Sequence, residues 1–233
     1  MTKVTAQMSI SLDGCYAGRK HDDPTSWLGS DEAAAFFRVT RWVIDAMAWR
    51  DRLGLEGGEP TVHSRVIEET FAKAGAYVMG RRMADGGEVP WGEEPPFHAP
   101  VFVVTHRERE TLRRAGGTSF TYVTDGIESA VQQARAVAGG KDVAIAGGGS
   151  LVRQALEIGL VDELELHIVP VVIGTGMRLL DLDMATKEGL ELQLDRLIET
   201  PEVLHVRYRV GAREPLVLDD RGGALSEAGW ETR

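Results

Sequence analysis

Three short segments carry residues suited to binding phosphate, and each follows a stretch that we expect to be a strand. Gly147, Gly148 and Gly149 follow the apolar run 143–146 and lead into an amphipathic stretch that opens at Ser150. Glycine lets the backbone approach a ligand closely, and the free N–H groups and the dipole of a helix start favour an anion. The pattern predicts a diphosphate-binding turn, although a plain tight turn before a helix would look similar.

The other two segments are basic. They are Gly80, Arg81 and Arg82 after the apolar run 75–79, and Thr105, His106 and Arg107 at the end of the run 101–105. The planar guanidinium group donates two hydrogen bonds to one phosphate, and ligands of open α/β sheets lie at the carboxyl ends of strands. A second anion beside a diphosphate is what NADP carries, so the coincidence of the three segments predicts an NADP site. Taken singly, the arginines could be an exposed helix start and His106 an ordinary surface histidine.

Strands and helices alternate along the chain, which predicts a three-layer α/β fold with a mostly parallel central sheet and helices on both faces. Expected strands are 4–12, 75–79, 101–105, 120–123, 143–146 and 163–168, the last extended by the apolar run 169–173; expected helices are 31–47, 61–74, 127–138 and 150–158. The alternating runs 190–198 and 203–210 predict a C-terminal antiparallel hairpin. We expect one domain over residues 1–210 and a partly irregular extension over 211–233.

Composition limits the classes of function. The 233 residues are 43% hydrophobic, enough for one large core. A net charge of −10 disfavours non-specific binding to nucleic acid or to an anionic membrane. Cys15 is the single cysteine, which fits a reducing compartment, and no signal peptide or membrane span stands out. We therefore expect a cytoplasmic protein, with no metal site because the six histidines lack ligand spacing.

Five segments, in order, carry a resemblance to a known family. They are Ser11-Leu12-Asp13-Gly14, Val78–Arg82, Val103–Thr105, Ile145–Gly149 and Leu160–Gly174. Together they resemble the dihydrofolate reductase-like superfamily, and most of all the branch that contains the C-terminal reductase domain of the bifunctional riboflavin-biosynthesis deaminase/reductase. The resemblance covers about residues 3–210 and implies a dihydrofolate reductase-like fold, an NADPH cofactor, a small heterocyclic substrate and a homodimer.

The resemblance also implies roles for individual residues. The loop from Asp13 to Gly18 would close over the nicotinamide, with Ala17 and Gly18 touching the ring. Arg81 and Arg82, with Thr105, His106 and Arg107, match the site of the 2′-phosphate. The diphosphate loop matches Gly147, Gly148, Gly149, Ser150, Leu151 and Val152, and its Gly-Gly peptide is usually cis in the family.

The proton donor is less clear from the sequence. Asp13 follows the first strand and could face the ligand as the catalytic residue, but it could equally form a turn with Gly14. The acid of true dihydrofolate reductases lies on the first helix, and none of Asp31, Glu32 and Asp45 can be matched to it. Asp31 fits a helix cap better.

The leading hypothesis is an NADPH-dependent reductase that transfers a hydride to a pterin or to an aminouracil-like substrate. The chain contains no zinc motif of the deaminase that accompanies riboflavin-pathway reductases, so a stand-alone relative is expected. A catalytically silent NADP-binding sensor or assembly module is the alternative. A flavin- or adenylate-binding protein is a third possibility, which predicts no preference for NADPH over NADH.

Overall fold

A nine-stranded sheet forms the middle layer of the fold. The computed structural model describes residues 2–21, 29–182 and 189–211. The strands lie in the order β10 (Leu192–Glu199), β11 (Leu204–Val210), β8 (Glu163–Val169), β1 (Val4–Ser11), β7 (Asp142–Gly147), β3 (Ala74–Gly80), β4 (Pro100–Val104), β6 (Ser119–Val123) and β5 (Leu112–Arg113). The six strands from β8 to β6 run parallel, while β11, β10 and β5 pair antiparallel with their neighbours. The predicted mixed sheet and its C-terminal hairpin are confirmed.

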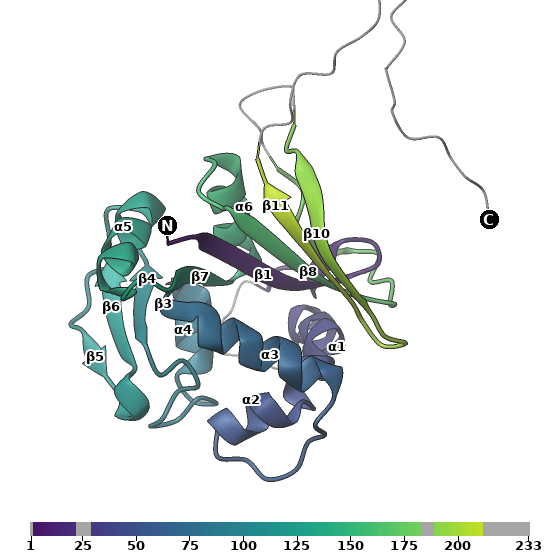
Figure 1. Ribbon diagram of the computed structural model, residues 1–233, viewed down its shortest axis with the longest axis horizontal. Helices are drawn as coiled ribbons and strands as arrows, with labels where there is room; N and C mark the ends of the chain where they lie inside the picture. Colours follow the sequence, from purple (N-terminus) through teal and green to yellow (C-terminus); the bar gives the residue numbers. More distant parts are fainter. Residues whose placement is uncertain (1, 22–28, 183–188, 212–233) are drawn as a thin grey trace, which may run out of the picture.

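Helices cover both faces of this sheet (Figure 1). One face carries α5 (Ile127–Val137) and α6 (Gly149–Glu157), whose apolar sides share a core with inward-facing residues of β1, β7 and β8. The other face carries α1 (Asp31–Ile44), α2 (Met47–Arg52), α3 (Val62–Lys73) and α4 (Arg81–Gly87), which pack in two smaller apolar clusters. The three-layer prediction is therefore confirmed.

The first predicted helix is divided in two. The chain leaves the helical conformation after α1, because Ala46 is extended and forms a bridge with Glu59 before α2 begins. The cap of α1 is also different from the prediction, since the hydroxyl of Ser30 accepts from the N–H of Ala33 at 3.3 Å and Asp31 is the first helical residue. Asp31 then acts as an acidic group in the first turn, which suits the helix dipole.

Strand β8 is shorter than predicted, because it ends at Val169 and the run 170–173 is not a strand. Proline at position 170 has no N–H for a ladder, and the N–H of Ile173 bonds instead to the carboxylate of Asp13 at 3.0 Å. Three short strands were missed: β5 at the edge of the large sheet, and β2 (Cys15–Gly18) and β9 (Gly176–Arg178), which form a separate two-stranded antiparallel sheet. This small sheet holds the loop that follows β1.

The contact between α3 and the strands β8 and β11 contains an unusual chain of buried histidines. His63 Nδ1 lies 2.9 Å from His205 Nε2, His205 Nδ1 lies 2.8 Å from His167 Nδ1, and His167 Nε2 lies 3.4 Å from the side-chain oxygen of Gln7. His167 must donate to Gln7, so three neutral rings, each donating in turn, satisfy every contact. Trp42 packs against the ring of His167 at 4.6 Å and against that of His205 at 4.9 Å.

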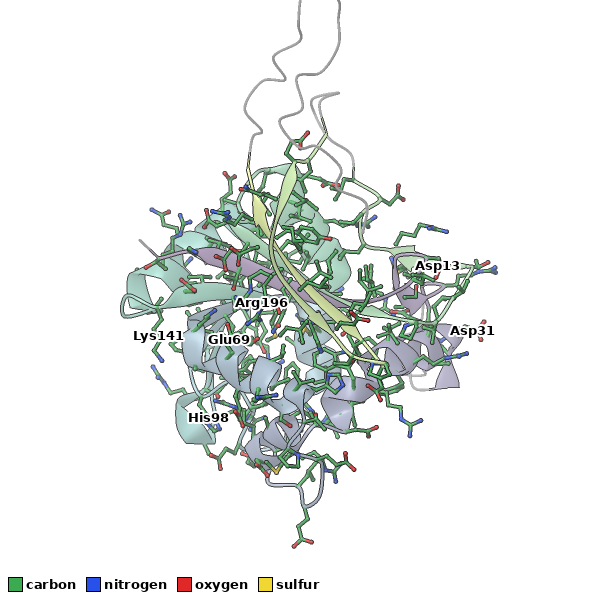
Figure 2. All side chains as sticks on the ribbon, turned by 45° about the vertical axis from the view of Figure 1, so that its right-hand side comes forward. Asp13, Asp31, Glu69, His98, Lys141 and Arg196 are labelled. Carbon is green, nitrogen blue, oxygen red and sulfur yellow. The ribbon has the colours of Figure 1, made fainter. Side chains whose placement is uncertain are left out.

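A charged network extends this polar layer. Arg196 and Arg207 each contact both Glu69 of α3 and Glu165 of β8. Burial alone would raise the pKa of Glu69, but hydrogen bonds from Arg196, Lys73 and Arg207 lower it to about 2. Figure 2 shows Glu69 and Arg196 in the middle of the molecule, away from the end that carries Asp13 and Asp31.

No described helix is long and apolar enough to cross a membrane. Within the same ranges, no group of three or more histidine, cysteine or acidic side chains is arranged to hold a metal ion.

Candidate functional site

The site residues predicted from the sequence converge on one edge of the sheet. Because β1, β3, β4 and β7 are parallel, their carboxyl ends lie together, and each leads directly into one of the predicted segments. Asp13 follows β1, Arg81 follows β3, Thr105 follows β4, and the glycine triplet begins at the last residue of β7. This is the edge at which open α/β sheets bind ligands.

The glycine turn (Gly147–Gly149) has a backbone suited to a close ligand. The Gly147–Gly148 peptide is cis, as the resemblance implies, and Gly147 has a φ of 123° that favours glycine. A side chain at Gly148 would meet no atom within 4 Å, so open space lies beside the turn. Leu151 and Val152 donate their N–H groups to the carbonyl of Gly148, while the N–H groups of Gly149 and Ser150 have no acceptor inside the helix. The start of α6 can therefore hold an anion.

Ala17 and Gly18 lie on β2, beside the first turn of α1. A methyl group at Gly18 would stand 2.1 Å from the carbonyl oxygen of Asp31, so only glycine allows this approach. Ala17 is buried and pairs with Met177 of β9. Both residues line the loop that the resemblance places over the nicotinamide, and that role stays a prediction.

The two neighbouring arginines point to different partners. Arg81 bonds to Asp85 at 2.6 Å, and its guanidinium lies 6.0 Å from the ring centre of Tyr122 on β6. Arg82 instead donates to the carboxylate of Glu32 at 2.8 Å and to the carbonyl of His21 at 2.9 Å. Glu32 is only 5% exposed, so this pair fixes α4 to α1. In this arrangement the two guanidinium groups have different partners, and the role of both in one 2′-phosphate site stays a prediction.

The segment after β4 combines one anchored residue with an exposed basic end. Thr105 is buried, bonds through its N–H to the carbonyl of Val123, and accepts from the N–H of Arg107 at 3.1 Å. His106 and Arg107 are exposed. Arg109, which the sequence analysis missed, lies 5.2 Å from the ring centre of Tyr122. Arg81, Tyr122 and Arg109 thus gather around one aromatic ring, called the basic cluster below, in which Arg81 is paired with Asp85 and Arg109 with Glu88 at 3.2 Å.

Asp13 is held by its own loop. Its carboxylate accepts from the Ser11 hydroxyl at 2.7 Å, from the N–H of Ile173 at 3.0 Å and from the N–H of Gly174 at 2.8 Å. The hydrogen bonds from Ser11 and from these two N–H groups lower the pKa of Asp13 well below its usual range. A carboxyl group that is ionised at neutral pH and has three donors around it is a poor proton source. The geometry favours the interpretation of Asp13 as a turn-former.

Comparison with known proteins identifies the family. The family model of the RibD C-terminal domain matches residues 2–206 of the chain. The chain belongs to the RibD C-terminal domain family. The resemblance seen in the sequence is thereby confirmed.

Relatives of this RibD C-terminal domain are distant in sequence. YyaP of Bacillus subtilis (strain 168) is 28% identical over 121 residues, which are 49% of this chain and 63% of YyaP. A putative riboflavin biosynthesis protein from Shewanella sp. PV-4 has a TM-score of 0.63 at 16% identity, over 91% of this chain and 100% of that structure. The Thermotoga maritima deaminase/5-amino-6-(5-phosphoribosylamino)uracil reductase has a TM-score of 0.54 at 11% identity, over 90% of this chain and 57% of that one. Structural likenesses at such identity show the fold, and this chain spans less than two thirds of YyaP and of the Thermotoga protein.

Proposed function

We propose that this protein is an NADPH-dependent reductase that transfers a hydride to a small nitrogen heterocycle, a pterin or an aminouracil-like compound. One observation carries the proposal: a glycine turn at a helix start and a separate basic cluster lie at the same carboxyl edge of the sheet. A dinucleotide with an additional phosphate has the two anionic groups that this pair of sites can bind.

The residues present fit such a cofactor. The open space beside Gly148 admits a phosphate oxygen close to the backbone, which a side chain at this position would prevent. In the basic cluster, Arg81 and Arg109 lie over Tyr122 and are paired with Asp85 and Glu88. A 2′-phosphate would replace these carboxylates as the partner of the arginines, while a flat adenine stacks on the ring. Arg107 extends the exposed basic surface after β4.

In this proposal the bound cofactor supplies the hydride, and the protein supplies orientation. The glycine turn fixes the diphosphate, the basic cluster selects the 2′-phosphate, and β2 with Ala17 and Gly18 shields the reacting ring from water. Asp13 keeps the loop after β1 in place through its bonds to Ser11 and Gly174.

The alternative, an NADP-binding module without catalysis, has one observation in its favour. Two acidic groups at this edge, Asp13 and Glu32, are both engaged, Asp13 by Ser11 and two backbone N–H groups and Glu32 by Arg82. Such a module would bind NADPH but consume none of it.

Calorimetry with NADPH and NADH tests the cofactor assignment. We expect Arg81→Ala to weaken NADPH binding by about tenfold or more, because a charge-assisted hydrogen bond is lost, and to change NADH binding little. Equal loss for both cofactors would place the 2′-phosphate elsewhere. NADPH consumption with a panel of pterins and aminouracils then separates the reductase from the silent module.

A further inference from the structure

Tyr16 of β2 covers the start of α6 in a way that neither the sequence motifs nor the family assign. A methyl group at Gly149 would stand 2.4 Å from Cε1 and 2.5 Å from Cζ of the Tyr16 ring, so the ring lies directly on the first residue of the helix. Tyr16 is 9% exposed. Glycine at 149 is therefore needed to seat this ring, whereas the neighbouring Gly148 faces open space.

The Tyr16 hydroxyl has a poor partner. Within the described residues its one hydrogen bond goes to the thioether sulfur of Met177 at 3.5 Å, and sulfur is a weak acceptor. Burial raises the pKa of Tyr16, with the positive charges of Arg153 and Arg82 opposing that rise and Glu32 adding to it. The hydroxyl therefore stays protonated at neutral pH and can donate to a stronger acceptor.

Arg153 brings a positive charge to the same face. It stands four residues after Gly149 on α6, so the two positions lie one above the other, and helical side chains tilt toward the N-terminus. Its guanidinium bonds to the carbonyl of Asp181 at 3.3 Å and makes no ion pair with any residue that the structure describes. Arg82, by contrast, shares its charge with Glu32.

We propose that the Tyr16 hydroxyl donates a hydrogen bond to the diphosphate of the dinucleotide at the glycine turn, and that Arg153 supplies the positive charge facing the same group. The inference rests on the proposed function and adds two positioning residues to it. A hydrogen bond to a phosphate oxygen replaces the weaker one to Met177, since charged acceptors bind donors more strongly than a thioether does. Binding would thus connect β2, which follows the first strand, to the start of α6.

The test compares Tyr16→Phe, Tyr16→Ala and Arg153→Ala with the wild type, and uses Tyr208→Phe on β11 as the matched tyrosine control. Calorimetry measures the binding of NADPH, NADH and adenosine 2′-monophosphate, which lacks the diphosphate. We expect Tyr16→Phe to weaken the binding of both dinucleotides about three- to tenfold. Arg153→Ala should weaken the binding of both about tenfold or more. Binding of the monophosphate, and all binding by Tyr208→Phe, should match the wild type.

Distinct results would overturn the inference. Unchanged binding of both dinucleotides by Tyr16→Phe would show that the hydroxyl touches no ligand, while the proposed function would stand. Tighter binding by Tyr16→Ala would show that the ring obstructs the turn instead of serving it. A wild type that binds neither dinucleotide would remove the proposed function and this inference together.

Discussion

Acid should destabilise this protein through His205, the central member of the buried histidine chain. Burial, together with the neighbouring His63 and the charge of Arg196, lowers the pKa of His205 from its ordinary value of 6.5 to about 4. In the unfolded chain the ring takes up a proton near pH 6.5, while the folded protein keeps it neutral. The unfolded state therefore binds more protons between pH 4 and 6.5, and the free energy of unfolding falls as pH falls through this window.

The size of this effect follows from the shift. A displacement of the pKa from 6.5 to about 4 corresponds to about 3 kcal/mol, at a steepest slope of about 1.4 kcal/mol per pH unit. Burial also lowers the pKa of His167, so its contribution has the same sign. Glu69 affects stability in a different pH range. Because its pKa is lowered to about 2, its contribution to the free energy of unfolding is fully present above pH 4.5 and is lost only below that pH.

Urea unfolding followed by tryptophan fluorescence measures the prediction at pH 7, 6, 5 and 4.5. His205→Gln keeps a polar amide but cannot titrate, so its free energy of unfolding should depend on pH less steeply than that of the wild type, by roughly 1 kcal/mol per unit near pH 5. His106→Gln, which changes an exposed histidine, is the control and should keep the wild-type slope. The reasoning would be refuted if the free energy of unfolding depended on pH equally steeply in His205→Gln and in the wild type.

Three further predictions concern the edge of the sheet and the surface. Gly148→Ala should leave the thermal midpoint near that of the wild type, because a methyl group there meets no atom within 4 Å. The same variant should bind NADPH and NADH more weakly, and undiminished binding would show that the diphosphate does not lie at the turn. Asp13→Asn should lower the urea midpoint, because its new amide N–H groups face the donors of Ile173 and Gly174, with NADPH affinity changed less than about twofold; a stable variant without turnover would restore Asp13 as the proton donor. The chain should sediment as a dimer at micromolar concentration, and Val172→Asp, at a side chain that is 66% exposed, should shift it toward the monomer; a wild-type monomer at every concentration would contradict this.

The fold was largely predictable because its signals are local. Continuous apolar runs bounded by glycine or charge, such as 143–146, become central parallel strands, and the alternating runs at the end of the chain become β10 and β11. Strands β2 and β9 have four and three residues, too few for a period to appear. They exist because their backbones pair with each other across more than 150 residues of chain, as in the pairing of Ala17 with Met177.

The site was predictable only in part, because backbone position and side-chain direction follow different rules. The strand ends place the three segments at one edge, and parallel pairing alone ensures this. The partner of Arg82, Glu32, lies on a helix 50 positions away in sequence, and Tyr122 approaches Arg109 from strand β6. The histidine chain is similar: His63 and His205 are 142 positions apart, and only packing of α3 on the sheet brings them together.

The divergence of Arg81 and Arg82 has a simple helical cause with experimental consequences. Consecutive residues of a helix differ by about 100° in direction, so at the start of α4 one side chain faces Tyr122 while the next faces Glu32. A double substitution would therefore combine two unrelated effects, loss of the proposed phosphate ligand Arg81 and loss of the partly buried ion pair of Arg82 with Glu32. Single variants separate them: Arg81→Ala should alter the preference for NADPH over NADH, whereas Arg82→Ala leaves Glu32, 5% exposed, without its cation and should lower the thermal midpoint first. If Arg82→Ala instead changed only the cofactor preference, the ion pair with Glu32 would have to open for binding, and both arginines would then serve the 2′-phosphate.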